Sequence, residues 1–150
     1  MYHHILVALD GSAQSERILP WLRPLVPESG GKVRLLTIYA PMQSVIVGKR
    51  TIAYSHQLES QAQMVTLAYL RRVATYLWAD GKLVACEARC GDPLEGILDV
   101  ARVAGVDLIA MAMPTTADGR RLRRRNIAAE VVRRAPVLVL VARDGDQRAA

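Results

Sequence analysis

The sequence predicts a single α/β domain built on a five-stranded parallel β-sheet with helices on both faces. Three observations lead to this fold class. The chain has 150 residues, the usual size of one domain. Five short apolar runs alternate with longer amphipathic stretches, as in successive βαβ units. Turn-forming pairs such as Asp10-Gly11 and Gly30-Gly31 separate them. We assign residues 1–142 to the domain and residues 143–150 to a polar C-terminal tail.

The predicted strands are runs of apolar residues, each bounded by turn-forming residues. In chain order they cover residues 2–9, 33–39, 83–90, 107–111 and 137–141. The last run is apolar throughout, so it predicts a strand whose open edge would promote aggregation unless a second subunit pairs with it.

Four stretches predict helices, at residues 12–26, 54–79, 94–104 and 126–134. The first is weak because Pro20 and Pro24 interrupt it, and either Ser12 or Ser15 is its expected N-cap. Asn126 is the expected N-cap of the last. The longest has apolar residues at three- and four-residue steps, which predicts a buried face of Leu58, Ala62, Val65, Tyr69, Val73 and Tyr76. Residues 41–51 and 114–125 are predicted loops.

Composition excludes several classes of protein and raises one question. Hydrophobic residues make up 51% of the chain, which excludes intrinsic disorder. Ten Gly, seven Pro and two Cys exclude a collagen-like chain and a disulfide scaffold. The net charge of +6 rests on 17 Arg and only three Lys. Such a charge indicates either an anionic partner or an Arg-rich solvated surface.

The cysteines and the termini bear on the compartment. Cys86 and Cys90 lie four apart in a predicted strand, and so ~13 Å apart at ~3.3 Å per residue. A disulfide needs less than ~7 Å between Cα atoms, so we expect two buried structural thiols. No run approaches the ~18 apolar residues of a membrane span, and the first apolar run is too short for a signal peptide. We therefore expect a cytoplasmic protein without a membrane partner.

Ligands of such folds bind at the carboxyl ends of the strands. This rule points to the loop after the first strand, at Asp10, and to the loop after the fourth, at residues 112–125. Neither a GxxxxGK[ST] nor a GxGxxG pattern is present, and no Ser/His/Asp or Cys/His arrangement suggests a nucleophile. We expect neither a catalytic residue nor a metal site.

Four segments in order resemble the universal stress protein family. They are ILVALDGS at residues 5–12, GDP at 91–93 followed by Ile97-Leu98, DLIAM at 107–111, and AEVVRRAPVLVLV at 129–141. The resemblance implies the strand order 3-2-1-4-5 and binding of ATP or another adenine nucleotide. It also implies a homodimer made through the last strand, at Val137, Leu138, Val139, Leu140 and Val141.

The family's nucleotide motif, G-x2-G-x9-G-[S/T], is degenerate in this chain. Ala112 stands at the first glycine, Thr115 or Thr116 at the second, and Asn126 and Ile127 at the final pair. Glycines let backbone N–H groups approach phosphate closely, and the last hydroxyl adds a hydrogen bond. Such bonds to a charged group contribute ~1.5–3 kcal/mol each, so losing two weakens binding by ~10²–10⁴-fold. We expect weak ATP binding or none.

The nucleoside side of the motif is retained. Asp10 matches the family's acidic residue after the first strand, Ile38 its apolar adenine contact, and Met111 the residue before the first glycine. Asp10 is equally well explained as a turn former before Gly11, and the two roles are compatible. Ile38 and Met111 are favoured as core residues. The candidate nucleotide site is therefore Asp10, Ile38, Met111, Ala112, Thr116 and Asn126.

An arginine cluster precedes the last predicted helix. Its members are Arg120, Arg121, Arg123, Arg124 and Arg125. Arginine binds phosphate through two parallel hydrogen bonds, and a helix N-terminus attracts anions, so the cluster is a candidate anion patch. It could also bind nucleic acid, but no aromatic residue lies between Arg120 and Arg134 to stack on bases. Only weak, salt-sensitive binding is expected from it.

These observations rank four hypotheses. The first is a non-enzymatic, dimeric stress-response protein with a degenerate nucleotide site. The second is a working adenine-nucleotide module for ATP, AMP or cyclic AMP. The third is an anion or nucleic-acid binder that uses the arginine cluster. A slow ATPase is the last, because Asp10 and Asp118 are the only acids in or beside the two loops.

Overall fold

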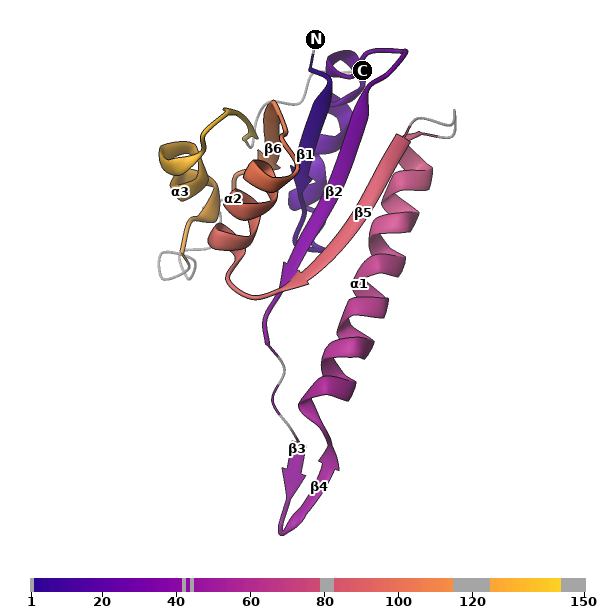
Figure 1. Cartoon of the computed structure of the whole chain (residues 1–150), viewed down its shortest axis with the longest axis vertical. Coiled ribbons are helices and arrows are strands. Elements are labelled where there is room, and N and C mark those ends of the chain that lie inside the picture. The colour runs from indigo at the N-terminus through magenta and orange to yellow at the C-terminus, as the bar shows by residue number, and fades with distance from the viewer. Residues whose placement is uncertain (1, 42, 44, 79–82, 115–124, 144–150) are drawn as a thin grey trace.

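Five parallel strands form the central sheet of the molecule (Figure 1). The computed structural model describes residues 2–41, 43, 45–78, 83–114 and 125–143. The strands are β1 (His4–Ala8), β2 (Lys32–Tyr39), β5 (Leu83–Cys90), β6 (Leu108–Ala112) and β7 (Leu138–Ala142). Their order across the sheet is β5-β2-β1-β6-β7. Counted along the chain this is 3-2-1-4-5, so the predicted fold class and strand order are confirmed.

Helical segments cover both faces of this sheet and enclose two apolar cores. The helix α1 (Ser55–Leu77) and the 3₁₀ helices η1 (Ser15–Trp21) and η2 (Arg23–Leu25) cover one face. The helices α2 (Pro93–Val103) and α3 (Ile127–Arg134) cover the other. Along β1, Ile5 and Val7 enter the core beneath α1, whereas Leu6 and Ala8 enter the core beneath α2. A parallel strand buried on both faces needs such a continuous apolar run.

The first predicted helix proves to be two short 3₁₀ helices. Pro20 lies inside η1, where it cannot donate a backbone hydrogen bond, and Pro24 lies within η2. The N-cap position of η1 is Gln14, so the prediction of Ser12 or Ser15 as N-cap was wrong. The Ser12 hydroxyl nevertheless accepts a hydrogen bond from the Ser15 N–H at 3.1 Å.

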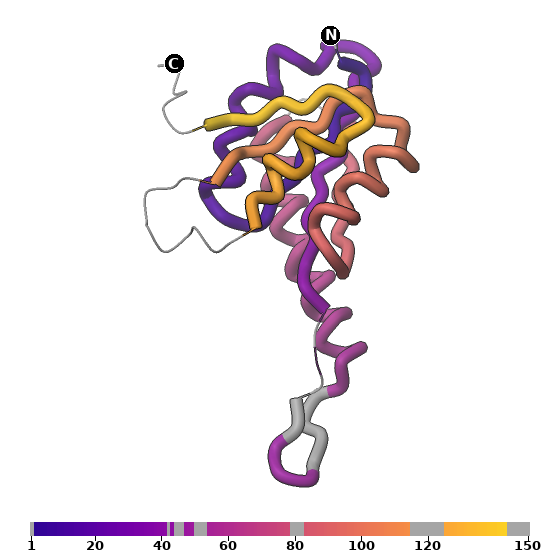
Figure 2. Tube along the Cα trace, turned by 90° about the vertical axis from the view of Figure 1, so that its left-hand side faces the viewer, coloured from indigo at the N-terminus to yellow at the C-terminus, as the bar shows by residue number. Residues whose placement is uncertain are grey.

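A β-hairpin replaces most of the loop predicted at residues 41–51. It consists of β3 (Val45–Val47) and β4 (Arg50–Ala53), joined by a turn in which Gly48 has a φ of 63°. The hairpin and the N-terminal half of α1 project well beyond the sheet (Figures 1 and 2). We call this projection, residues 45–65, the arm. Three- and four-residue strands are too short to stand out from sequence.

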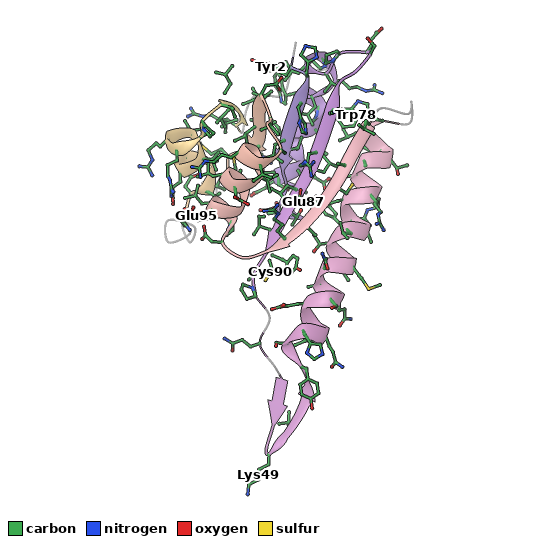
Figure 3. The ribbon with its side chains drawn as sticks, in the orientation of Figure 1. Tyr2, Lys49, Trp78, Glu87, Cys90 and Glu95 are labelled. Carbon is green, nitrogen blue, oxygen red and sulfur yellow. The ribbon has the colours of Figure 1, made fainter. Side chains whose placement is uncertain are left out.

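The buried face of α1 differs from the predicted one. Leu70, Val73 and Leu77 are its buried residues, while Val65 and Tyr76 are exposed. The thiol prediction was also partly wrong: both cysteines are free, but Cys86 is half-buried and Cys90 is exposed at the end of β5 (Figure 3). Among the described residues, no helix is long and apolar enough to cross a membrane.

Candidate functional site

The carboxyl end of β1 carries the acidic residue of the candidate site. The carboxylate of Asp10 accepts hydrogen bonds from the N–H of Ser12 at 2.8 Å and from its hydroxyl. The Asp10 N–H donates to the Ser15 hydroxyl at 3.2 Å. Burial opposes the charge, but the bonds from Ser12 and Ser15 outweigh it and lower the pKa of Asp10 below its ordinary value. Asp10 is thus a turn former, as expected, and an ionised carboxylate at the site.

The structure brings Ile38 and Met111 to the same edge of the sheet as Asp10. They end β2 and β6, the two neighbours of β1 in the parallel order. Met111 is buried in the core beneath α2, and Ile38 is half-buried against the same core. The Ile38 side chain lies directly over Gly96, where an added Cβ would sit 2.6 Å from the Ile38 Cδ1. Their role as core residues is confirmed, and their contact with a ligand stays a prediction.

The sheet itself occupies the position of the motif's first glycine. Ala112 is the last residue of β6 and pairs with Ala142 of β7. The next N–H, of Met113, donates to the Ala142 carbonyl at 2.8 Å. This backbone is therefore engaged in the sheet, and a phosphate would have to displace a strand hydrogen bond to use it.

Asn126 is engaged at the start of α3. It is the N-cap, as predicted, and its side-chain oxygen accepts from the Ala129 N–H at 3.1 Å. The first N–H groups of a helix are the ones that bind a phosphate, since no carbonyl of the helix satisfies them. In this chain a carboxamide already satisfies one of them.

Arg125 joins the beginnings of two helices. Its guanidinium donates to both carboxylate oxygens of Glu130 on α3, at 2.8 and 2.9 Å. It also donates to Asp92, the N-cap of α2, whose carboxylate in turn accepts from the Glu95 N–H. Bonding to Glu130 and Asp92 raises the pKa of Arg125. Two carboxylates thus balance the one member of the arginine cluster that the structure describes.

The remaining predicted site residues lie outside the described residues. They are Thr116 from the nucleotide motif and Arg120, Arg121, Arg123 and Arg124 from the arginine cluster. The polar tail at residues 144–150 lies outside them as well. Of the arginines at the end of α3, Arg134 pairs with Glu95 of α2 at 2.9 Å (Figure 3).

Sequence reasoning missed two groups that the fold brings to this edge. Tyr69 of α1 donates its hydroxyl to Glu16 of η1 at 2.9 Å, beside Ser15. Burial and the bond to Glu16 raise the pKa of Tyr69, which stays neutral. Asp92 was expected only as a turn residue, and its bond to Arg125 spans 33 positions of the chain. No local pattern predicts contacts of this separation, although an Asp before Pro at a helix start does indicate an N-cap.

Within the described part of the chain, no three His, Cys, Asp or Glu residues are grouped so that they could hold a metal ion. The carboxyl edge of the sheet therefore offers three things to a ligand. One is the ionised Asp10 with its two serines. Another is the apolar edge of Ile38. The third is the start of α3, which the chain's own side chains occupy.

Comparison with known proteins places this arrangement among relatives. The family model described as "Universal stress protein family" matches residues 1–143. The comparison with curated proteins gave no match.

Solved structures share the fold at low sequence identity. The hypothetical protein MJ0577 is 19% identical, with a TM-score of 0.76 over 97% of this chain and 99% of that one. A universal stress protein in complex with cAMP is 21% identical, with a TM-score of 0.68 over 95% and 97% of the two chains. An Arabidopsis thaliana family protein with AMP bound is 14% identical, with a TM-score of 0.60 over 93% and 90%.

Proposed function

Because the chain belongs to the universal stress protein family, we propose that it is a non-enzymatic stress-response protein with a degenerate nucleotide site. In this proposal the phosphate-binding half of the site is lost and the nucleoside-binding half is retained. The observation that carries it is the bond from the Ala129 N–H to the Asn126 side chain, because it fills a phosphate-binding position with the chain itself.

The loss of the phosphate half is supported at three points of the motif. Ala112 is held in the sheet, Asn126 caps α3, and Ile127 carries no hydroxyl. Arg125 offers little compensation, since Glu130 and Asp92 already bind its guanidinium. An arriving phosphate would compete with two carboxylates for that guanidinium. ATP, which makes most of its charged contacts through phosphates, should therefore bind weakly.

A second candidate function is a module for an adenine nucleotide with one phosphate. It is favoured by the geometry of Asp10, which presents an ionised carboxylate next to the half-buried Ile38. A carboxylate accepts hydrogen bonds from a ribose or an amine, and an apolar edge packs on a base. Two relatives were solved with cAMP and with AMP, and the same class of ligand fits this proposal.

The proposed function predicts what the purified protein carries. We expect freshly purified protein, denatured and analysed by chromatography, to release no stoichiometric ATP. Any nucleotide released should be AMP or cyclic AMP, at less than one per chain. One ATP per chain would contradict the proposal, because it would require an intact phosphate site.

We further propose that β7 makes a homodimer. Among the described strands β7 pairs only with β6, and Leu138 on it is 63% exposed. An apolar edge of this kind is stabilised by pairing with a second copy. We expect Leu138→Lys to raise the dissociation constant of the dimer in light scattering, because lysine at an edge opposes strand pairing.

Val132→Lys is the matched control for this substitution. Val132 is also exposed, but it lies on α3 rather than on β7. It adds the same charge and should leave the dimer unchanged. A wild-type monomer at micromolar concentration would contradict pairing through β7.

A further inference from the structure

The outer face of α1 has the composition of a protein interface rather than that of a solvated helix. Between Glu59 and Arg71 the helix has no charged residue, although a helix face in water usually carries many. The exposed positions include Met64, which is 72% exposed, and Val65 and Tyr76, at 65% and 85%. Depletion of Asp, Glu and Lys together with Met, Tyr and Arg is typical of interface cores.

This face is also ordered as a continuous seam. The exposed residues follow one another at alternating steps of four and three, as in a coiled coil: Gln57, Gln61, Met64, Ala68, Arg71 and Thr75. No described element covers this side of the helix (Figure 1). The C-terminal half of α1 packs on the sheet through its other face, and the N-terminal half belongs to the arm (Figures 1 and 2).

We propose that this seam pairs two copies of the chain through an antiparallel contact of their α1 helices, with the two-fold axis at Thr66. This register sets Met64 of one copy against Ala68 of the other, a large residue against a small one. It sets Gln61 against Arg71, whose guanidinium can donate to the Gln61 side-chain oxygen. It also covers the most exposed aromatic residue, because Tyr76 meets His56. Each projecting arm then lies along the anchored half of the other helix.

Charge permits this pairing in spite of the net charge of +6. In an antiparallel pair centred on Thr66, the two Arg71 side chains are ten residues apart along the axis, or about 15 Å. This exceeds the screening length of about 10 Å at 0.1 M salt, so their repulsion is weak. A parallel pair would set Arg71 and Arg72 directly against their copies, so the antiparallel arrangement is favoured.

The size of the seam matches what a stable contact needs. A standard interface buries roughly 800 Å² on each partner, a patch roughly 32 Å across. The 23 residues of α1 extend about 34 Å. The contact goes beyond the proposed function and is independent of pairing through β7. Together the two contacts would join more than two chains.

Cysteine cross-linking tests both the contact and its register. In a background of Cys86→Ser and Cys90→Ser, protein with Met64→Cys is mixed with protein with Ala68→Cys under mild oxidation. Facing residues fall within the ~7 Å that a disulfide allows, so we expect rapid formation of the mixed disulfide. Gln63→Cys mixed with Ala68→Cys is the matched control, because Gln63 is exposed on α1 but lies outside the seam.

The expected result is cross-linking several-fold faster for the pair at 64 and 68 than for the control. Adding Leu138→Lys should not slow it, whereas Met64→Glu alone should lower the mass of the largest species in light scattering from that of the wild type. Equal rates for the two pairs, or a wild-type assembly that Met64→Glu does not reduce, would overturn the proposal. Capture of an unrelated protein by α1 without cross-linking would overturn it as well.

Discussion

Restoring the family motif is expected to strengthen ATP binding by about 10²–10⁴-fold. The variant combines Ala112→Gly, Asn126→Gly and Ile127→Ser. Asn126→Gly removes the carboxamide that now occupies the Ala129 N–H, so that donor becomes available to a phosphate. Ile127→Ser places a hydroxyl at the first residue of α3, and Ala112→Gly removes a Cβ beside the site. Isothermal titration calorimetry measures the gain.

The cost of these substitutions to stability is small enough to leave the fold intact. Glycine at an N-cap costs a few tenths of a kcal/mol relative to Asn. Glycine in a strand costs about 0.5–1 kcal/mol relative to Ala. Ile127 is half-buried against the core beneath α2, so the serine also loses some apolar packing. Thermal unfolding followed by circular dichroism establishes that the variant is folded before its affinity is compared.

The control retains the two glycines and replaces Ile127→Ser with Ile127→Val, which has no hydroxyl. It should gain part of the affinity, because only the backbone contacts are restored. AMP, with one phosphate, should gain less than ATP. A folded variant with unchanged ATP affinity, or with equal gains for AMP and ATP, would show that this motif does not set phosphate binding.

Asp10→Asn is expected to weaken AMP and cyclic AMP binding by about 10- to 150-fold. This is the loss of a charge-assisted hydrogen bond of ~1.5–3 kcal/mol. The amide oxygen of Asn can still accept from the Ser12 N–H, so the turn after β1 is kept and the loss reports on the charge. Glu28→Gln removes the same charge at an exposed position before β2 and should have no effect. Equal affinities of Asp10→Asn and wild type would remove Asp10 from the site.

The same carboxylate sets a pH dependence. The bonds from Ser12 and Ser15 hold the pKa of Asp10 below its ordinary value in the folded protein. Its contribution to stability is therefore present above the ordinary, unfolded pKa and is lost as the pH falls through the lowered one. Nucleotide affinity should be constant from neutral pH down to about pH 5 and fall only in stronger acid.

Much of the fold follows from the sequence because parallel strands buried on both faces leave a clear signal. All five main strands begin and end within two residues of the predicted positions. The buried face of α1 was harder to predict, because its N-terminal half leaves the sheet and no core selects its apolar residues. Val65 and Tyr76 fit a helical period and yet are exposed.

The candidate site was predictable only where a local pattern carries it. Asp10 and the Asn126 cap follow from residues next to them in the chain. The engagement of Arg125 does not, because its partner Asp92 is 33 positions away and reaches it only through the packing of α2 against α3. A run of arginines predicts positive charge, but not which carboxylates the fold sets against it.

The most direct test of the central claim is a calorimetric titration of the wild-type protein with ATP, AMP and cyclic AMP at one salt concentration. If the phosphate half of the site is lost and the nucleoside half is retained, ATP binds at millimolar concentration or not at all. AMP or cyclic AMP then binds at least as tightly as ATP. Micromolar ATP binding, with AMP much weaker, would contradict the account, because the triphosphate would then supply the binding energy.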